Sequence, residues 1–202
     1  MTINKKIMLK GYEKLKERME LIPHIVVEQK HLLSCPIYLF DLNSKIDPNY
    51  ITEICKKYQT LEFKEKETQS VYAWRSDYLH RGSKAIPELE PLFQLVEGKT
   101  TKIIKDGYKS VVDHYWFAIY NQGDSSKIHN HYGCELACVY YASYPENSAP
   151  LVITHLDSEI SITPKPGNLL VFPAICDHRV PVSENTKERI IVAMNTLKYS
   201  SF

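Results

Sequence analysis

Apolar residues in the first half of the chain recur at the three- to four-residue spacing of helices. This pattern covers residues 9–21, and a second apolar stripe runs through residues 87–105 behind Pro87. Asp47-Pro48 is a cap and first-turn signal that predicts a further helix over residues 50–58. Residues 36–40 read as a strand between these helices. We therefore expect the first half to supply helices that brace a sheet.

The second half has the pattern of strands. Short runs rich in β-branched and aromatic residues are separated by turn-forming pieces, with no insert long enough to be a helix. Strands joined this way pair antiparallel. The predicted strands cover residues 111–120, 136–142, 151–155, 160–163, 169–172 and 190–194. The fold class we expect is mainly β with N-terminal helices, a double-stranded β-helix (jelly roll) braced by helices.

Length and spacing favour one domain. The chain has 202 residues, no internal repeat and no low-complexity linker. We expect an N-terminal helical extension over residues 1–34 and a jelly-roll domain over residues 35–202. Within that domain, helical support spans about residues 48–108 and the jelly-roll core about residues 111–197.

Charge and hydropathy limit the partners. The 25 basic and 24 acidic residues give a net charge of +1, so no overall field attracts nucleic acid. No stretch approaches the roughly 20 apolar residues of a membrane span, and the first ten residues lack the apolar core of a secretory signal. The five cysteines are an odd number without a CxxC pair, which argues against a disulfide framework. We expect a cytoplasmic protein with reduced thiols and neither membrane nor nucleic-acid partners, and the sequence leaves a homodimer open.

Three histidines suggest a metal site. His129 and His131 stand two residues apart, so in an extended strand both side chains lie on one face. His178 follows a predicted buried strand and can approach from the opposite lip of a rolled sheet. Imidazole is a good ligand for iron, zinc, copper and nickel. The alternative is that the pair only forms hydrogen bonds on a polar strand face; we likewise expect His114 and His155 to be ordinary sheet histidines.

Two motifs are similar to those of the cupins. Gly123, His129, His131 and Glu135 match G-x5-H-x-H-x3-E, and the second cupin motif is met by Gly167, Pro173 and His178. Three other positions depart from the motifs, with Ala142 and Ile175 in place of glycine and Val182 in place of asparagine. This resemblance implies metal binding by His129, His131, Glu135 and His178.

More of the chain resembles a family of viral and bacterial 2-oxoglutarate/iron(II)-dependent oxygenases. The resemblance covers about residues 116–195 and rests on a Gly-Asp-x4-His-x-His stretch, a Val-Tyr-Tyr strand and a Pro-Gly-to-Phe-Pro segment. These stand at residues 123–131, 139–141 and 166–173, followed by His178-Arg-Val-Pro181 and the segment from Arg189 to Asn195. It implies Fe(II), 2-oxoglutarate as cosubstrate and molecular oxygen, with a substrate hydroxylated and succinate and carbon dioxide released.

Arg189 distinguishes the two resemblances. Oxygenases of this class place a basic residue here to hold the distal carboxylate of the cosubstrate, and a guanidinium can do so with two hydrogen bonds. The resemblance also implies that Tyr140 or Tyr141, whichever points inward, binds the cosubstrate. The apolar run after Arg189 predicts a buried strand; the alternative is a surface arginine paired with Glu184 or Glu188.

The ligand set departs from the family pattern, because His131 stands where a carboxylate is common. Glu135 could supply one only if the chain bends at Gly133, since four residues of extended strand span about 13 Å. The third ligand is therefore His131, Glu135 or water. A cupin-type metalloenzyme without a keto acid, either a three-histidine dioxygenase or an isomerase, and a non-enzymatic ligand-binding jelly roll stay as alternatives. The substrate is a small molecule or a protein side chain, and we expect residues 74–84 and 144–149 to select it.

Overall fold

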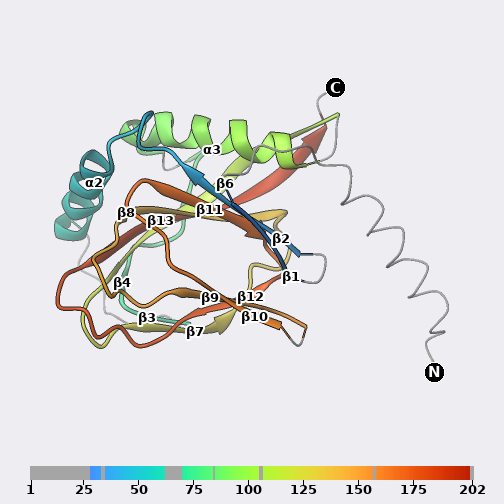
Figure 1. The fold of residues 1–202 in the computed structure, drawn as a ribbon. Helices are drawn as coiled ribbons and strands as arrows, with labels where there is room; N and C mark the ends of the chain where they lie inside the picture. The colour runs from blue at the N-terminus through green and yellow to red at the C-terminus, as the bar shows by residue number, and fades with distance from the viewer. Residues whose placement is uncertain are drawn as a thin grey trace.

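Two antiparallel sheets face each other in the computed structural model, which describes residues 28–32, 35–61, 70–83, 85–104, 107–156 and 158–200 (Figure 1). The larger sheet has the order β1 (Glu28–Leu32), β2 (Cys35–Asp41), β11 (Asn168–Pro173), β8 (Leu136–Ser143), β13 (Arg189–Ser200), β6 (Tyr108–Tyr120) and β4 (Trp74–Arg75), with β5 (Leu79–His80) also paired to β6. The smaller sheet has the order β10 (Ser158–Ile162), β9 (Leu151–His155), β12 (Asp177–Val180), β7 (Ser125–His129) and β3 (Val71–Tyr72).

Helices cover the outer face of the larger sheet. Figure 1 shows α2 (Pro48–Leu61) and α3 (Glu90–Ile103) on the side opposite the smaller sheet, and the short helix η1 (Pro87–Leu89) leads into α3. The Asp47 carboxylate accepts the backbone N–H of Asn49 at 2.9 Å, which supports the first turn of α2. The apolar stripe of α3, including Phe93 and Val96, is fully buried. No helix in the described ranges is long and apolar enough to cross a membrane.

Strand alternation divides the interior into two cores. On β6, Tyr115, Phe117 and Ile119 belong to the core under the helices, whereas the residues between them, such as Trp116 and Tyr120, belong to the core between the sheets. The inner core is therefore lined by every second residue of the larger sheet. This inner space is where the candidate site lies.

The mainly β, antiparallel class predicted from the sequence is confirmed, as are the helices expected near residues 50–58 and 87–105. The sequence did not predict strands β7 and β12, because both are short and their polar residues obscure the alternation of apolar and polar positions. The helix expected over residues 9–21 lies outside the described residues. Residues 28–32, placed by the sequence in a helical extension, instead form β1 and pair with β2.

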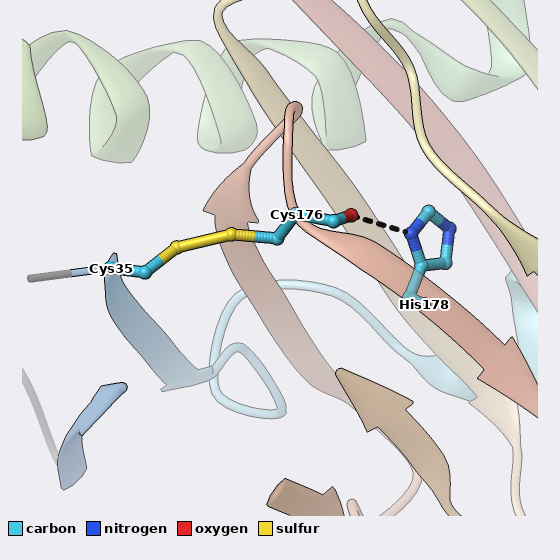
Figure 2. The surroundings of a disulfide bond; sticks show 3 residues. All are labelled: Cys35, Cys176 and His178. Carbon is cyan, nitrogen blue, oxygen red and sulfur yellow. Dashed lines mark hydrogen bonds between the residues drawn. A yellow bond between two sulfur atoms is a disulfide. The ribbon is translucent and has the colours of Figure 1, made fainter. Parts of the chain in front are cut away.

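The expectation that all cysteines are free thiols is wrong for one pair. Cys35, which begins β2, forms a disulfide with Cys176 in the turn between β11 and β12 (Figure 2). The two residues are 141 positions apart in sequence, so only the pairing of β2 with β11 brings them together. Among the described residues, Cys55, Cys134 and Cys138 are free.

Candidate metal centre

Three imidazoles converge between the sheets. His129 ends β7 and His178 lies in β12, where their Cα atoms are register partners and their ring centroids are 4.3 Å apart. The ring of His131 lies 5.0 Å from that of His178 and 5.3 Å from that of His129. One ligand atom from each residue lies within 4.8 Å of the other two. The structure thus brings together the three histidines that the sequence singled out.

His131 reaches this cluster by a different route from the one its spacing suggests. β7 ends at His129, so the two side chains do not share a strand face. Beyond β7, the N–H of His131 donates to the carbonyl of Ala174 at 2.8 Å, and the Asn130 amide donates to the Asp177 carboxylate at 2.7 Å. These contacts fold the chain back so that His131 faces His178.

Backbone carbonyls fix which nitrogen of two rings faces the cluster. The Nδ1 atom of His129 lies 2.8 Å from the carbonyl oxygen of Lys127, and that of His178 lies 3.2 Å from the carbonyl oxygen of Cys176 (Figure 2). Because a carbonyl only accepts, each Nδ1 carries the proton. The Nε2 lone pairs of His129 and His178 are therefore free to bind a metal.

The histidines are held in the neutral form that metal binding requires. Burial lowers the pKa of His178 to about 4, with the charge of His129 adding to the effect. Burial, followed by the charges of His178 and His129, lowers the pKa of His131 to about 3. Burial also lowers the pKa of His129. At neutral pH all three imidazoles are uncharged, so a cation does not have to displace protons from them.

Glu135 is not brought to the cluster. Its carboxylate lies 3.5 Å from the Lys198 ammonium, and its N–H donates to the carbonyl of Thr196. The chain does bend at Gly133, which has φ of 98°, but the bend leads into β8 alongside β13 and not back to the histidines. The clustered donors are therefore three imidazoles without this carboxylate.

Arg189 is a buried cation with no counter-ion among the residues that the structure describes. It is 1% exposed, and none of its three guanidinium nitrogens makes a hydrogen bond to a described residue. Rings surround it instead: its Cζ atom lies 4.9 Å from the ring centroid of Tyr120 and 5.4 Å from that of Tyr141. Glu188, offered by the surface alternative, forms an ion pair with Lys56.

One internal cavity joins the histidines to the arginine. Its wall contains His129, His131, His178 and Arg189, together with aromatic and aliphatic residues of the inner core. Arg189 faces this cavity because alternate residues of β13, including Ile191, belong to the inner core. An anion bound by the guanidinium would therefore share an enclosed space with a metal held by the imidazoles.

Tyr141, and not Tyr140, lies beside Arg189. Tyr140 packs in the core under the helices, whereas Tyr141 packs in the inner core. Burial raises the pKa of Tyr141 to about 12 despite the nearby guanidinium, so its hydroxyl keeps its proton. That hydroxyl makes no hydrogen bond to the described residues and can donate to a ligand.

Trp116, to which no role was assigned from the sequence, borders the site together with Tyr78 and Arg75. The ring centroid of Trp116 lies 5.3 Å from that of His131 and 5.0 Å from that of Tyr78. The guanidinium of Arg75 lies over Tyr78, 4.1 Å from its centroid. The period-two alternation of residues 111–120 was the signal that could have placed Trp116 inward. Arg75 and Tyr78 belong to the segment expected to select the substrate.

Comparisons with known proteins identify solved structures with a similar fold. Neither protein-family models nor curated proteins match the sequence. Solved structures do match. A prolyl-4-hydroxylase from Pseudomonas putida has a TM-score of 0.61 at 15% identity over 80% of this chain and 91% of its own. A 2OG-Fe(II) oxygenase family member from Burkholderia pseudomallei has a TM-score of 0.57 at 11% identity over 98% and 93%. A Trichoplax adhaerens prolyl hydroxylase, solved with a hypoxia inducible factor peptide, has a TM-score of 0.60 at 12% identity over 96% and 94%. The chain thus has the fold of the 2OG-Fe(II) oxygenases.

Proposed function

We propose that the protein is an iron(II)- and 2-oxoglutarate-dependent dioxygenase that hydroxylates a small molecule or a protein side chain and releases succinate and carbon dioxide. One observation carries this proposal. The guanidinium of Arg189, which has no hydrogen-bond partner among the described residues, lines the same cavity as the three imidazoles. A dicarboxylate could therefore be held at one end by the arginine and at the other by a metal. The shared fold supports it.

The donor set fits iron. Imidazole nitrogens of His129, His131 and His178 bind Fe(II) as well as zinc, copper and nickel. All three are neutral, so they leave the full charge of a divalent ion uncompensated, which favours an anionic cosubstrate in the remaining positions. Bound iron supplies oxygen activation coupled to decarboxylation of the keto acid.

The anion site fits the far carboxylate of 2-oxoglutarate. An unpaired charge is costly to bury, so the position of Arg189 is best explained by a ligand that brings the opposite charge. The planar guanidinium donates two parallel hydrogen bonds to a carboxylate, and the protonated Tyr141 hydroxyl donates a further one. The surrounding aromatic rings exclude water and strengthen these contacts.

The substrate reaches the centre past His131 in this proposal. Trp116 and Tyr78 form an aromatic wall next to His131, and the Arg75 side chain covers Tyr78. The residues of this wall are not the residues that surround Arg189 and would bind the cosubstrate. Specificity is therefore separable from cosubstrate binding.

Anaerobic binding followed by a single turnover tests the proposal. Fe(II)-loaded protein should develop the visible absorption of a keto acid chelated to ferrous iron when 2-oxoglutarate is added, and should release succinate when oxygen is admitted. Arg189→Ala should abolish both at the same cosubstrate concentration. Arg179→Ala is the matched control, because Arg179 is a partly exposed arginine paired with Glu159 at 3.0 Å. An unchanged iron spectrum in the wild type would refute the proposal.

A cupin-type dioxygenase without a keto acid is the second candidate. The all-histidine donor set favours it, because Glu135 does not bring a carboxylate to the cluster. This candidate predicts metal binding by the same histidines but no response of the iron to 2-oxoglutarate. The anaerobic titration separates the two functions.

A further inference from the structure

A second cluster of metal-ligating side chains lies outside the histidine centre. The sulfur atoms of Cys35 and Cys176 and a ring nitrogen of His155 all lie within 4.8 Å of one another. Within the described ranges, this cluster and the histidine centre are the two groups with such spacing. The proposed oxygenase chemistry uses none of these three side chains.

Strand pairing explains why these residues meet. In the β9–β12 ladder, His178 is the partner of Ile153 and Asp177 is the partner of Thr154. One step further along the same register sets Cys176 opposite His155. Cys176 itself sits in a tight turn, where its N–H donates to the carbonyl of Pro173 at 3.0 Å.

Cys35 arrives from the other sheet. It is the first residue of β2, which pairs with β11 just before that turn. The cluster therefore stands where the larger and smaller sheets meet, and a bond or an ion there ties the two together. Both sulfur-bearing residues are almost fully buried, with Cys35 3% and Cys176 0% exposed.

The backbone spacing of the two cysteines fits an ion better than it fits a disulfide. The Cα atoms of Cys35 and Cys176 are 7.7 Å apart. Disulfides usually join Cα atoms about 4.4–6.8 Å apart. In a tetrahedral zinc site with Zn–S bonds of about 2.3 Å, two sulfurs lie about 3.8 Å from each other. Reduction and a small rotation of the two side chains would open that distance.

The disulfide joins Cys35 to Cys176 and does not involve His155, which lies beside both sulfur atoms. Its ring makes no hydrogen bond or ion pair with the parts of the chain that the structure describes, although it is partly buried next to both sulfurs. Two thiolates and one imidazole form a donor set suited to zinc, and zinc sites with three protein ligands hold water in the fourth position.

We propose that the reduced protein binds a zinc-class divalent ion through Cys35, Cys176 and His155, and that oxidation replaces this ion with the disulfide. In reduction, the S–S bond breaks as two molecules of a thiol reductant each give up a hydrogen and join as a disulfide. The two cysteines gain those two hydrogens. Metal binding then releases both thiol protons. In oxidation, a disulfide oxidant takes two electrons from the two thiolates and two protons from solvent, becoming two thiols, as the cysteines rejoin and the ion leaves.

This site adjoins the histidine centre through one backbone group. The carbonyl of Cys176 accepts the Nδ1–H of His178, as Figure 2 shows beside the disulfide. The bridge or the ion would hold that carbonyl in place in either redox state. Metal binding at the cysteines does not require the proposed oxygenase activity, so the two proposals can fail separately.

Cobalt(II) titration tests the proposal. Full-length protein is reduced with a phosphine, stripped of metal with a chelator, desalted anaerobically and titrated with Co(II). Thiolate ligation produces sulfur-to-cobalt charge-transfer absorption in the near ultraviolet, which imidazole ligands at the histidine centre cannot produce. We expect this band in the reduced wild type and not in the disulfide form, whose intact mass is lower by two hydrogens.

Variants assign the band to residues. Cys35→Ser and Cys176→Ser should lose it, and His155→Ala should weaken cobalt binding by about tenfold or more. His129→Ala should keep it, and so should Cys134→Ser, the matched control at a free cysteine near the histidine centre. Absence of the band in the reduced wild type, or its loss in Cys134→Ser with retention in Cys35→Ser, would overturn the proposal.

A measurement on the wild type removes any dependence on folding of the variants. Reduced protein is alkylated with iodoacetamide with and without zinc, and the modified peptides are quantified by mass spectrometry. Zinc should slow alkylation of Cys35 and Cys176 and leave Cys134 unaffected. Equal rates at Cys35 with and without zinc would contradict the assignment.

Discussion

His129 and His178 face each other across the β7–β12 pair, with their Cα atoms in register and their ring centroids 4.3 Å apart. Each ring donates its Nδ1 proton to a backbone carbonyl two residues earlier in the chain. This repeated arrangement turns both Nε2 atoms inward without help from another side chain. A site fixed by strand backbone in this way keeps its geometry before any ligand binds.

Removal of His178 should therefore abolish metal binding at the centre. We expect His178→Ala to weaken Fe(II) or Mn(II) affinity by more than about 100-fold, because it removes a ligand and not merely a residue that orients one. Isothermal titration of metal-free protein measures the change. His80→Ala serves as the control, because the His80 side chain is 62% exposed. Similar affinities for the two variants would contradict the proposed centre.

The metal-free protein should lose stability as the pH falls below about 6.5. In the folded state burial lowers the pKa of His129, His131 and His178, whereas in the unfolded chain each titrates near 6.5. Between about pH 6.5 and pH 4 the unfolded chain binds more protons, so the free energy of unfolding decreases with acidification. The loss is up to about 1.4 kcal/mol per pH unit for each histidine.

Urea unfolding in the presence of a chelator at pH 7, 6 and 5 measures this dependence. His178→Gln should flatten the slope over that range, because it removes one of the titrating groups and retains most of the volume. Identical slopes for wild type and His178→Gln would show that other residues cause the acid sensitivity.

Arg189→Met should separate cosubstrate binding from stability. Since Arg189 is buried without a partner among the described residues, an apolar side chain of similar length should stabilise the ligand-free protein by about 1–4 kcal/mol. The same variant should lose the stabilisation that 2-oxoglutarate gives to the metal-loaded wild type. Thermal unfolding with and without 2-oxoglutarate measures both effects. A variant that is less stable but still responds to 2-oxoglutarate would contradict the assigned role.

The sequence predicted the histidines better than it predicted their surroundings. His129 and His131 were singled out because few residue types bind metals and the two stand two residues apart, and His178 because it follows a predicted buried strand. The apolar run after Arg189 favoured a buried position for that residue. The choice between Tyr140 and Tyr141 needed the structure, because alternation shows that the two face opposite sides but not which side is the cavity. The Cys35–Cys176 contact was missed because it depends on the register between distant strands, which no local pattern encodes.

Trp116 should report metal binding by fluorescence. Its ring centroid lies 5.3 Å from that of His131, close enough for a paramagnetic ion at the centre to quench its emission. Addition of Co(II) to chelator-treated protein in its disulfide form should quench a large part of the tryptophan signal. Trp116→Phe should remove most of that quenching and leave Trp74 as the remaining tryptophan. Equal quenching in the variant would show that the ion binds elsewhere.

Gly167→Ala should destabilise the junction at which β11 begins. Gly167 has φ of 81°, and an added Cβ would lie 2.1 Å from Oδ1 of Asn43, whose amide donates to the carbonyl of Pro166 at 3.0 Å. The left-handed backbone alone costs an alanine about 1–2 kcal/mol, and displacement of the Asn43 amide adds the loss of a hydrogen bond, about 1 kcal/mol. Gly98→Ala is the matched control, because Gly98 lies within α3 with nothing within 4 Å of its added Cβ. The higher helix propensity of alanine should raise the free energy of unfolding of that variant by roughly 1 kcal/mol. Urea unfolding measures the free energy of both variants, and a Gly167→Ala protein as stable as Gly98→Ala would show that this junction tolerates a side chain.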